Sequence, residues 1–331
     1  MECTVVVTGG SGFLGGKIAE RLRSDGYRVY RMALPQESVS GPEFFKGDIT
    51  DPGRFELPDA EIIVHCAGIL ESSHPSDELM FKVNYEGTVN VYEKALEKGM
   101  KKFVMISTVS AIGPQGTRNE GMTESTPPRP DDAYGRSKLK AERFLLRRGE
   151  EDGIEVVILR PTVLYGEGMN VHSSGMKTFT SIKKGYLPLV GGGETIFNLL
   201  HVDNLVEAVR LSVKKARSIS VYNVGEGPYT LAHVVGVIEG KMGKKGHIRM
   251  PGFILLSLAI LFKVLGPILK GPPPVSMVKY RGLTSDIWHM DSSKIRKELG
   301  YRTVVTLEEG VSRTVDHYGW SDDDPLKEEH K

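Results

Sequence analysis

The sequence predicts an α/β fold built on a doubly wound parallel sheet, and three observations lead to that class. Short runs rich in Val and Ile alternate with helix-like stretches through the first half of the chain. These runs are apolar at nearly every position, which is typical of parallel strands covered by helices on both faces. The chain has 331 residues, enough for one large domain and a smaller lobe.

The elements of the first half follow one another in a β-α rhythm. Strands are expected at residues 4–8, 28–33, 62–66, 103–107 and 156–160, with a further one just before Gly47. Helices are expected at 17–24, 84–98 and 137–148. Proline and acidic residues make 51–59 and 124–132 loops. Alternating strands and helices of this kind form a parallel sheet with right-handed crossovers.

The chain changes character after residue 165. A loop-rich stretch precedes a helix, a strand and a later short helix, expected at 201–214, 220–224 and 292–299. We therefore expect a smaller C-terminal lobe that is interleaved with the first domain. The first domain takes residues 1–165 and 201–224, and the substrate lobe takes 166–200 and 225–321. The last ten residues, 322–331, are expected to form a flexible tail.

Charge and cysteine content exclude several classes of function. Lys and Arg number 43 and Asp and Glu 42, giving a net charge of +1, so no basic field for nucleic acid is expected. Two cysteines, Cys3 and Cys66, are too few for a disulfide scaffold or a four-cysteine zinc site, and no metal is expected. The first residues lack the pattern of a secretory signal. A cytoplasmic protein is the expectation.

A glycine-rich turn, GGSGFLG, follows the first predicted strand and opens the first predicted helix. A dinucleotide pyrophosphate binds backbone N–H groups at a helix N-terminus and needs glycines that let it approach. Gly9 permits the turn, Gly12 the close approach and Gly15 the packing of helix on strand, with Phe13 and Leu14 between them. The turn therefore predicts a Rossmann-type site for a nicotinamide dinucleotide.

The choice between NAD and NADP stays open. An acidic residue that binds the ribose 2′-hydroxyl usually ends the second strand, but residues 29–34 contain none. Arg31 either meets a 2′-phosphate or is simply solvated. Asp48, followed by Ile49, comes after the third strand and either contacts the adenine or caps a turn.

Tyr134 and Lys138 are spaced to lie one turn apart on the same face of a helix. A nearby ammonium favours a phenolate, so Lys138 is expected to lower the pKa of Tyr134 and make it a general acid/base. Lys138 would also hold the nicotinamide ribose. Thr108, at the carboxyl end of a predicted strand, is expected to hold the substrate oxygen beside Tyr134.

Six motifs occur in order between residues 8 and 204: TGGSGFLGG, GDIT, HCAG, YGRSK, RPTVLYG and HVDN. This pattern resembles the extended short-chain dehydrogenase/reductase superfamily, also described as the NAD-dependent epimerase/dehydratase type. The resemblance implies that Thr108, in place of the commoner serine, Tyr134 and Lys138 are catalytic, and that Asn84 organises the proton relay. It implies a homodimer, and further cofactor contacts at Cys66, Ala67, Gly68, Pro161 and Val163.

The apolar stretch 253–269, FILLSLAILFKVLGPIL, bears on the substrate. It contains Lys263 and Gly266-Pro267, so it is a poor candidate for a membrane span. With the Pro-Pro turn that follows, the layout resembles the 3β-hydroxysteroid and sterol-4-carboxylate dehydrogenase branch. That branch implies NAD(P)-dependent interconversion of a secondary alcohol and a ketone on a sterol- or isoprenoid-like substrate. The stretch would wall an apolar pocket, touch a membrane peripherally, or form the core of the lobe.

Two other readings are possible. Nucleotide-sugar 4-epimerases and dehydratases use the same catalytic groups and need cations for a diphosphate. Arg281 resembles an epimerase arginine, and Lys177 and Arg249 would assist it. A catalytically silent cofactor-binding protein is the third reading, and the complete set of Thr108, Tyr134 and Lys138 disfavours it. In the first two, the substrate is a small molecule.

Overall fold

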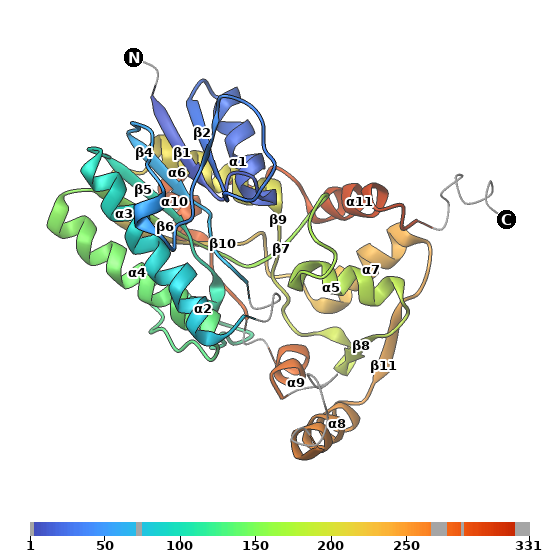
Figure 1. Ribbon diagram of the computed structural model, residues 1–331. Coiled ribbons are helices and arrows are strands. Elements are labelled where there is room, and N and C mark those ends of the chain that lie inside the picture. Colours follow the sequence, from blue (N-terminus) through green and yellow to red (C-terminus); the bar gives the residue numbers. More distant parts are fainter. Residues whose placement is uncertain (1–2, 71–74, 266–276, 286–287, 322–331) are drawn as a thin grey trace.

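The computed structural model describes residues 3–70, 75–265, 277–285 and 288–321 (Figure 1). The expected tail at 322–331 and the end of the apolar stretch, residues 266–269, lie outside this part of the chain.

Seven parallel strands form the central sheet, in the order β10-β6-β5-β4-β1-β2-β3. The order reverses at β1, which lies between the halves formed by β4 and β2 (Figure 1). This confirms the predicted doubly wound parallel sheet. The strands are β1 (Thr4–Thr8), β2 (Arg28–Ala33), β3 (Phe44–Lys46), β4 (Ile62–His65), β5 (Lys102–Ile106), β6 (Glu155–Pro161) and β10 (Ser220–Val224).

Helices cover both faces of this sheet, because successive residues of a buried strand point to opposite sides. Val5 and Val7 pack in one apolar cluster with helices α1 and α6. Val6 packs in a second cluster with α3 and α4. Figure 1 shows α3 and α4 on the side of the sheet away from α1. The helices are α1 (Phe13–Ser24), α3 (Gly87–Glu97), α4 (Ala133–Asp152) and α6 (Val202–Lys215).

Helix α4 is longer than the sequence predicted, since it begins at residue 133 and not at 137. The carboxylate of Asp132 accepts a hydrogen bond from the Gly135 N–H at 2.5 Å and caps the helix. Gly153 ends it in the left-handed conformation, with φ 68°. The early start places Tyr134 in the first turn of α4, on the same element as Lys138.

The first three residues of the helix predicted at 84–98 lie in a turn of different helical geometry, and α3 begins only at residue 87. Helix α2 (Asp77–Phe81) runs into a π-helical turn, η3 (Lys82–Glu86), before α3 begins. Such turns are rare and often lie at functional sites. Three short 3₁₀ turns, η1 (Pro52–Arg54), η4 (Val109–Ala111) and η5 (Gly191–Gly193), complete the connections.

A third apolar cluster lies outside the main sheet and draws on separate parts of the chain. It joins Tyr165, Phe179, Leu199, Val235 and Val311. Two small parallel sheets, β7-β9 and β8-β11, flank it. Its elements are β7 (Val163–Tyr165), α5 (Ser174–Lys183), β8 (Leu187–Val190), β9 (Leu199–His201), α7 (Leu231–Met242), β11 (His247–Met250) and α11 (Leu307–His317).

Helix α10 (Ser293–Leu299) comes from the range expected for the substrate lobe, yet it packs on the main sheet. Its Ile295 and Leu299 join the same apolar cluster as α6 and β10. Tyr222 of β10 donates a hydrogen bond to Glu298 at 2.8 Å. The chain therefore returns to the first domain before it forms α11.

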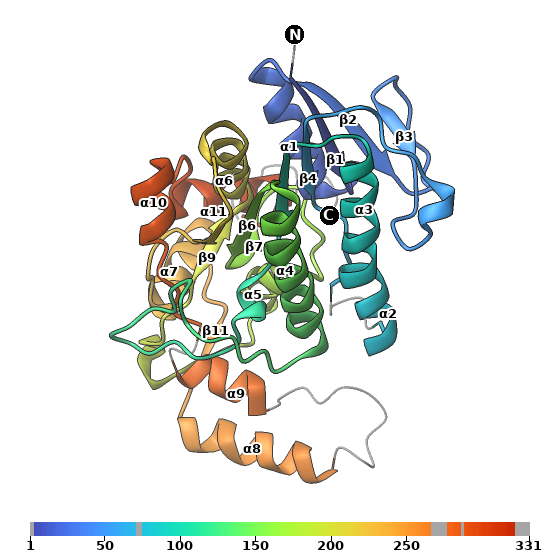
Figure 2. The ribbon, with the colours of Figure 1, turned by 90° about the vertical axis from the view of Figure 1, so that its left-hand side faces the viewer.

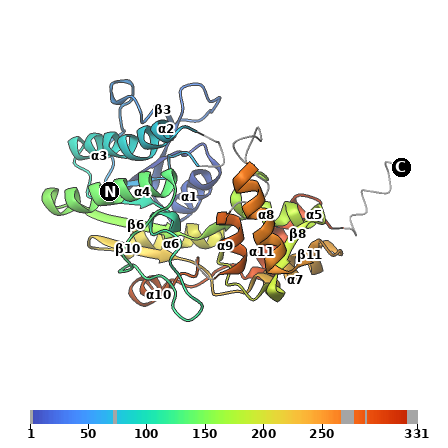
Figure 3. The same ribbon diagram turned by 90° about the horizontal axis from the view of Figure 1, so that it is seen from below.

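Helix α8 (Gly252–Leu265) holds most of the apolar stretch and lies at the edge of the molecule beside α9 (Met277–Thr284) (Figure 2). Only Leu255 and Ala259 of α8 are buried, while Phe253 is 71% and Val264 68% exposed. The reading of this stretch as the core of the lobe is therefore wrong. Seen from below, α8 and α9 lie in front of the second lobe (Figure 3). Among the described residues, no helix is long and apolar enough to cross a membrane.

Candidate active site

The glycine-rich turn between β1 and α1 is shaped for close approach. Gly9 has φ +63°, and a Cβ there would lie 3.0 Å from the Ala67 Cα. A Cβ on Gly15 would lie 2.2 Å from the Gly9 carbonyl oxygen, so only glycine fits. Gly12 caps α1 without a side-chain hydrogen bond, and the first turn holds no acidic residue. The N–H groups of this turn fit the pyrophosphate of a dinucleotide.

Phe13 and Leu14, also predicted to contact the cofactor, lie on different sides of the first turn of α1. Leu14 packs against the apolar cluster of the sheet. Phe13 is half-buried, and a Cβ on Gly168 would lie 3.6 Å from its ring. The segment that follows β7 therefore reaches the glycine-rich turn.

The segment after β4 is held by a buried histidine, His65, the first residue of the HCAG motif. His65 lies 2.8 Å from the Thr8 hydroxyl through Nδ1 and 3.0 Å from the Thr88 hydroxyl through Nε2. Burial lowers the pKa of His65 to about 3, so the ring is neutral. The Thr8 hydroxyl in turn accepts a hydrogen bond from the Ala67 N–H at 3.2 Å. His65 thus fixes the loop opposite Gly9.

Gly68 lies against two of the predicted catalytic residues. A Cβ at this position would lie 2.8 Å from Asn84 Oδ1 and 3.2 Å from Lys138 Nζ. The side chain of Cys66, two residues earlier, is a thiol rather than a thiolate, since burial raises its pKa to about 12. Cys66, Ala67 and Gly68 therefore lie between the glycine-rich turn and the catalytic residues.

Asn84 lies in the π-helical turn and is fully buried. Its amide donates to the Ile69 carbonyl at 3.0 Å and to the Ser137 hydroxyl at 3.2 Å, while its oxygen accepts from the Ile69 N–H at 2.9 Å. Its side chain therefore ties the loop after β4 to helix α4. The resemblance implied a role in proton relay, and the contacts here position the loop and α4.

Thr108, Tyr134 and Lys138 come together at the carboxyl edge of the sheet. The Thr108 side chain lies close enough to the Tyr134 hydroxyl to lower its pKa. The Thr108 hydroxyl also accepts from the Ser110 N–H at 3.2 Å, which fixes its rotamer at the end of β5. Lys138 is buried and donates to the Ile106 carbonyl at 3.1 Å. An alcohol oxygen near Tyr134 would meet two hydroxyl groups.

The pKa of Tyr134 differs from the sequence expectation. Burial raises it to about 12, the neighbouring Thr108 hydroxyl acts in the lowering direction, and the Asp132 charge raises it. Lys138 is itself affected, because burial lowers its pKa to about 8 while Cys66 and Glu142 act in the opposite direction. The expected depression of the Tyr134 pKa by Lys138 is therefore not found. Desolvation outweighs the effect of an ammonium that is bonded to a backbone carbonyl.

A buried ion pair extends this set along α4 and was missed from sequence. Glu142 accepts from Arg160 Nη2 at 2.6 Å and from Arg160 Nε at 3.0 Å, and from the Ser107 hydroxyl at 2.5 Å. Tyr134, Lys138 and Glu142 recur every four residues on one helix face. That spacing was a signal for Glu142, although no pattern identified its partner on β6.

Two other predicted cofactor residues, Arg31 and Asp48, make hydrogen bonds to backbone groups of the protein. Arg31 donates to the Gly10 carbonyl from Nε at 2.8 Å and from Nη2 at 2.6 Å, and it stacks on Phe44 at 4.4 Å. Asp48 Oδ1 accepts from the Thr50 N–H at 2.9 Å and caps a turn. Ile49 is buried against Gly87.

Pro161 is the last residue of β6, which pairs with β5, and Val163 begins β7 two residues later. Pro161 is buried and Val163 half-buried. They lie at the same edge of the sheet as Thr108, where α/β proteins bind their ligands.

The three cations considered for a diphosphate are dispersed. Lys177, Arg249 and Arg281 are exposed on α5, β11 and α9. Among the described residues, none of the three takes part in an ion pair. The structure does not bring them to Thr108 and Tyr134 by any contact.

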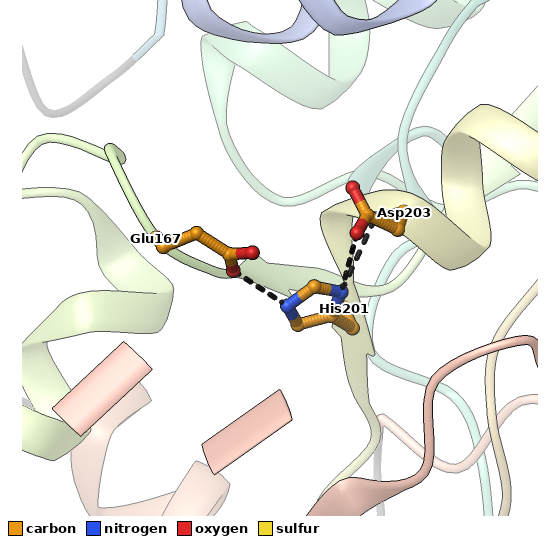
Figure 4. Close-up of side chains that lie close together, drawn as sticks. All are labelled: Glu167, His201 and Asp203. Carbon is orange, nitrogen blue, oxygen red and sulfur yellow. Dashed lines mark hydrogen bonds and ion pairs between the residues drawn. The ribbon is translucent and has the colours of Figure 1, made fainter. Parts of the chain in front are cut away.

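Glu167, His201 and Asp203 form a cluster with metal-binding atoms within 4.8 Å of one another (Figure 4). His201 Nε2 lies 2.9 Å from Glu167, and Asp203 N–H donates to His201 Nδ1 at 3.2 Å. Arg313 of α11 bonds both carboxylates. An arginine already supplies the positive charge, so the cluster joins β7, α6 and α11 rather than fitting a cation.

The family profile described as the NAD dependent epimerase/dehydratase family matches residues 5–225. A 3β-hydroxysteroid-dehydrogenase/decarboxylase, isoform 1, of Arabidopsis thaliana is 25% identical, covering 95% of this chain and 79% of its own. A UDP-glucose 4-epimerase of Vibrio cholerae is 27% identical, covering 95% of each chain.

The fold is shared with a solved structure from Thermus thermophilus. The UDP-glucose 4-epimerase complex with NAD from that organism superposes with a TM-score of 0.71 and 24% identity, over 96% of this chain and 99% of the other.

Proposed function

The chain belongs to the NAD dependent epimerase/dehydratase family, and from that premise we propose that it interconverts a secondary alcohol and a ketone on a hydrophobic substrate. As a member of this family it is an NAD(P)-dependent enzyme of the extended short-chain type. The proposed substrate is sterol- or isoprenoid-like. The observation that carries the chemistry is that the Thr108 and Tyr134 hydroxyl groups lie close enough to interact, beside buried Lys138.

Tyr134 exchanges a proton with the substrate oxygen, and Thr108 orients that oxygen by a hydrogen bond. The phenol is protonated at neutral pH, because burial raises the pKa of Tyr134 to about 12. It is therefore a ready donor to a ketone oxygen. In alcohol oxidation Tyr134 must first lose its proton, so this direction is favoured at higher pH.

The nicotinamide, when bound, accepts or donates the hydride. The residues proposed to hold the dinucleotide are the glycine-rich turn and the segment from Cys66 to Gly68, with Lys138 at the ribose. Gly68 leaves room between that segment and Lys138, since any side chain there would meet Asn84 and Lys138. Asn84, Glu142 and Arg160 keep this surface in place from behind.

The proposed substrate class rests on helix α8. Its side chains include six apolar residues that are more than a third exposed, of which Phe253 and Val264 are the most exposed. A gathering of exposed apolar side chains of this size marks a site for a partner, a lipid or a ligand. Among the residues that the structure describes, no comparable gathering of cations joins Arg281 to the catalytic residues.

Peripheral contact of α8 with a membrane is part of the same proposal. Between Glu239 and Asp286 the sequence holds eight Lys and Arg residues and no acidic one. Cations flanking an apolar helix are the chemistry that attracts an anionic bilayer surface and then buries the apolar face in it. A substrate that partitions into lipid would be taken up at that surface.

The experiment that tests the function is a cofactor-coupled assay with two substrate panels. Purified enzyme is incubated with NAD⁺ or NADP⁺ and either hydroxysteroids and isoprenoid alcohols or UDP-sugars, while absorbance at the reduced-nicotinamide band is followed. We expect net reduction of the cofactor with a hydrophobic alcohol. Interconversion of UDP-sugars without net reduction would overturn the proposal in favour of an epimerase.

A further inference from the structure

The loop that follows β2 carries an acidic residue, Glu37, whose side chain contacts the glycine-rich turn. Glu37 Oε2 accepts a hydrogen bond from the Ser11 hydroxyl at 2.6 Å and from the Leu34 N–H at 2.8 Å. Ser11 is the residue between Gly10 and Gly12. Two bonds to one oxygen hold the Glu37 carboxylate at the edge of the nucleotide site, although Glu37 stands four residues beyond the end of β2.

The second carboxylate oxygen has spare capacity. Within the described ranges Glu37 Oε1 accepts no hydrogen bond, so it is available to a hydroxyl donor. A ribose hydroxyl is such a donor, whereas a phosphate at the same position presents only acceptor oxygens and about −1.5 to −2 charges. The carboxylate is thus complementary to a 2′-hydroxyl and repels a 2′-phosphate.

The neighbouring cationic side chains already make hydrogen bonds or ion pairs within the protein. Arg31 gives Nε and Nη2 to the Gly10 carbonyl and lies on the Phe44 ring. Lys46 donates to the carbonyls of Leu34 and Glu37. Arg23 is paired with Glu43 at 3.2 Å. The donors of these cations that are seen bonded therefore face backbone carbonyls or a carboxylate, whereas Glu37 keeps an acceptor oxygen without a partner among the described residues.

From these contacts we infer that Glu37 selects NAD over NADP, by accepting the ribose 2′-hydroxyl and excluding a 2′-phosphate. The inference rests on the proposed placement of the dinucleotide at the glycine-rich turn and is independent of the substrate. The sequence suggested Arg31 as a ligand of a 2′-phosphate. We infer instead that Glu37, in the loop after β2, contacts the ribose 2′ position.

The test is a binding titration of the full chain with NADH and with NADPH, followed by nicotinamide fluorescence. The wild-type enzyme is expected to bind NADH more tightly. Glu37→Gln removes the charge and keeps the shape, and it should lower the ratio of the two affinities by about tenfold or more, the range for a charged hydrogen bond. Glu37→Lys should lower it further.

Glu56→Gln is the control, because it removes one exposed carboxylate that pairs with Lys94 and contacts neither Ser11 nor Arg23. It should leave the ratio unchanged, and a thermal melt of each variant checks that the loop change has not unfolded the protein. A wild-type enzyme that binds NADPH as tightly as NADH would overturn the inference. An unchanged ratio in both Glu37 variants would also overturn it, whereas binding of neither dinucleotide would refute the proposed function itself.

Discussion

The carboxyl edge of the main sheet and helix α8 depart from the usual distribution of side chains in opposite directions. At the sheet edge, His65, Asn84 and Glu142 are polar and almost wholly buried, and each is hydrogen-bonded. On α8, Phe253 and Val264 are apolar and mostly exposed. Apolar side chains are usually buried and polar side chains are usually exposed, so both regions depart from this pattern.

The two exceptions have different consequences. Buried polar groups are costly unless paired, so those at the sheet edge fix one geometry around Tyr134 and Lys138. Exposed apolar groups fix no geometry within the chain, and their cost falls only when something covers them. The sheet edge therefore determines the chemistry at Tyr134 and Lys138. The exposed face of α8 determines which apolar substrate or surface the protein can bind.

The strongest test of the sheet edge is Tyr134→Phe. The variant lacks the hydroxyl that exchanges a proton with the substrate, and turnover should fall by about 10²- to 10⁴-fold, the usual range for a general acid/base. Cofactor affinity, measured by NADH fluorescence, should be unchanged. Tyr186→Phe, which removes an exposed hydroxyl elsewhere, serves as the control. Near-normal turnover in Tyr134→Phe would remove the role assigned to it.

Glu142→Gln tests the ion pair behind the site. The change leaves Arg160 charged and buried without its partner, which usually costs about 3–5 kcal/mol in the free energy of unfolding. Urea denaturation measures this loss. Glu151→Gln breaks an exposed pair with Arg147 on the same helix and should have only a slight effect. Equal effects of the two substitutions would show that burial adds nothing to the Glu142 pair.

The paired substitution Phe253→Ser and Val264→Ser tests α8. If these side chains enter a bilayer, affinity for vesicles of phosphatidylserine and phosphatidylcholine should fall about tenfold or more, since each buried apolar side chain is worth about 1.5–3 kcal/mol. Sedimentation of the vesicles measures the bound fraction. Val304→Ser is the control, as an exposed apolar residue outside α8. Failure of the wild-type protein to bind these vesicles would refute the membrane contact.

The last test concerns the pH dependence of stability and His65. Its pKa is about 3 in the folded protein and near 6.5 when unfolded. Between these values the unfolded chain binds a proton that the native protein excludes, so stability falls as the pH falls from about 6.5 towards 3, by at most about 1.4 kcal/mol per pH unit. His65→Gln should make this dependence shallower, as followed by urea unfolding at each pH.

Glu226 acts with the opposite sign in part of that range. Burial raises its pKa to about 7, so the native protein binds the extra proton between about 4.5 and 7 and gains stability as the pH falls there. The difference between wild type and His65→Gln is therefore the quantity to compare. His233→Gln, at an exposed position, should match the wild-type slope. A His65→Gln slope equal to wild type would contradict a neutral, buried His65.

Much of the fold was predictable because parallel strands covered on both faces leave continuous apolar runs, as in 4–8 and 156–160. The same runs located Thr108 just after β5, and the four-residue spacing of Tyr134 and Lys138 predicted that they share one helix face. Helix α4 began earlier than predicted because its cap, Asp132, lies in a segment that proline and acids had marked as a loop.

Other features depend on tertiary contacts that no local pattern contains. The pKa of Tyr134 follows from burial, and the occupation of Arg31 follows from a carbonyl 21 residues away. Glu37 reaches Ser11 only through the path of a loop. An apolar run such as 253–265 has the same sequence whether it is covered or exposed, so its position at the molecular edge was not predictable.

The way the third apolar cluster is assembled has a consequence for protein engineering. It combines Tyr165 and Phe179, from before the final strand of the main sheet, with Val235 and Val311 from after it. A chimaera that exchanges only the segment after residue 225 with a relative would place foreign α7 and α11 against the original β7 and α5. Transplanting substrate preference therefore requires at least two exchanged blocks, with the strand of residues 220–224 kept between them.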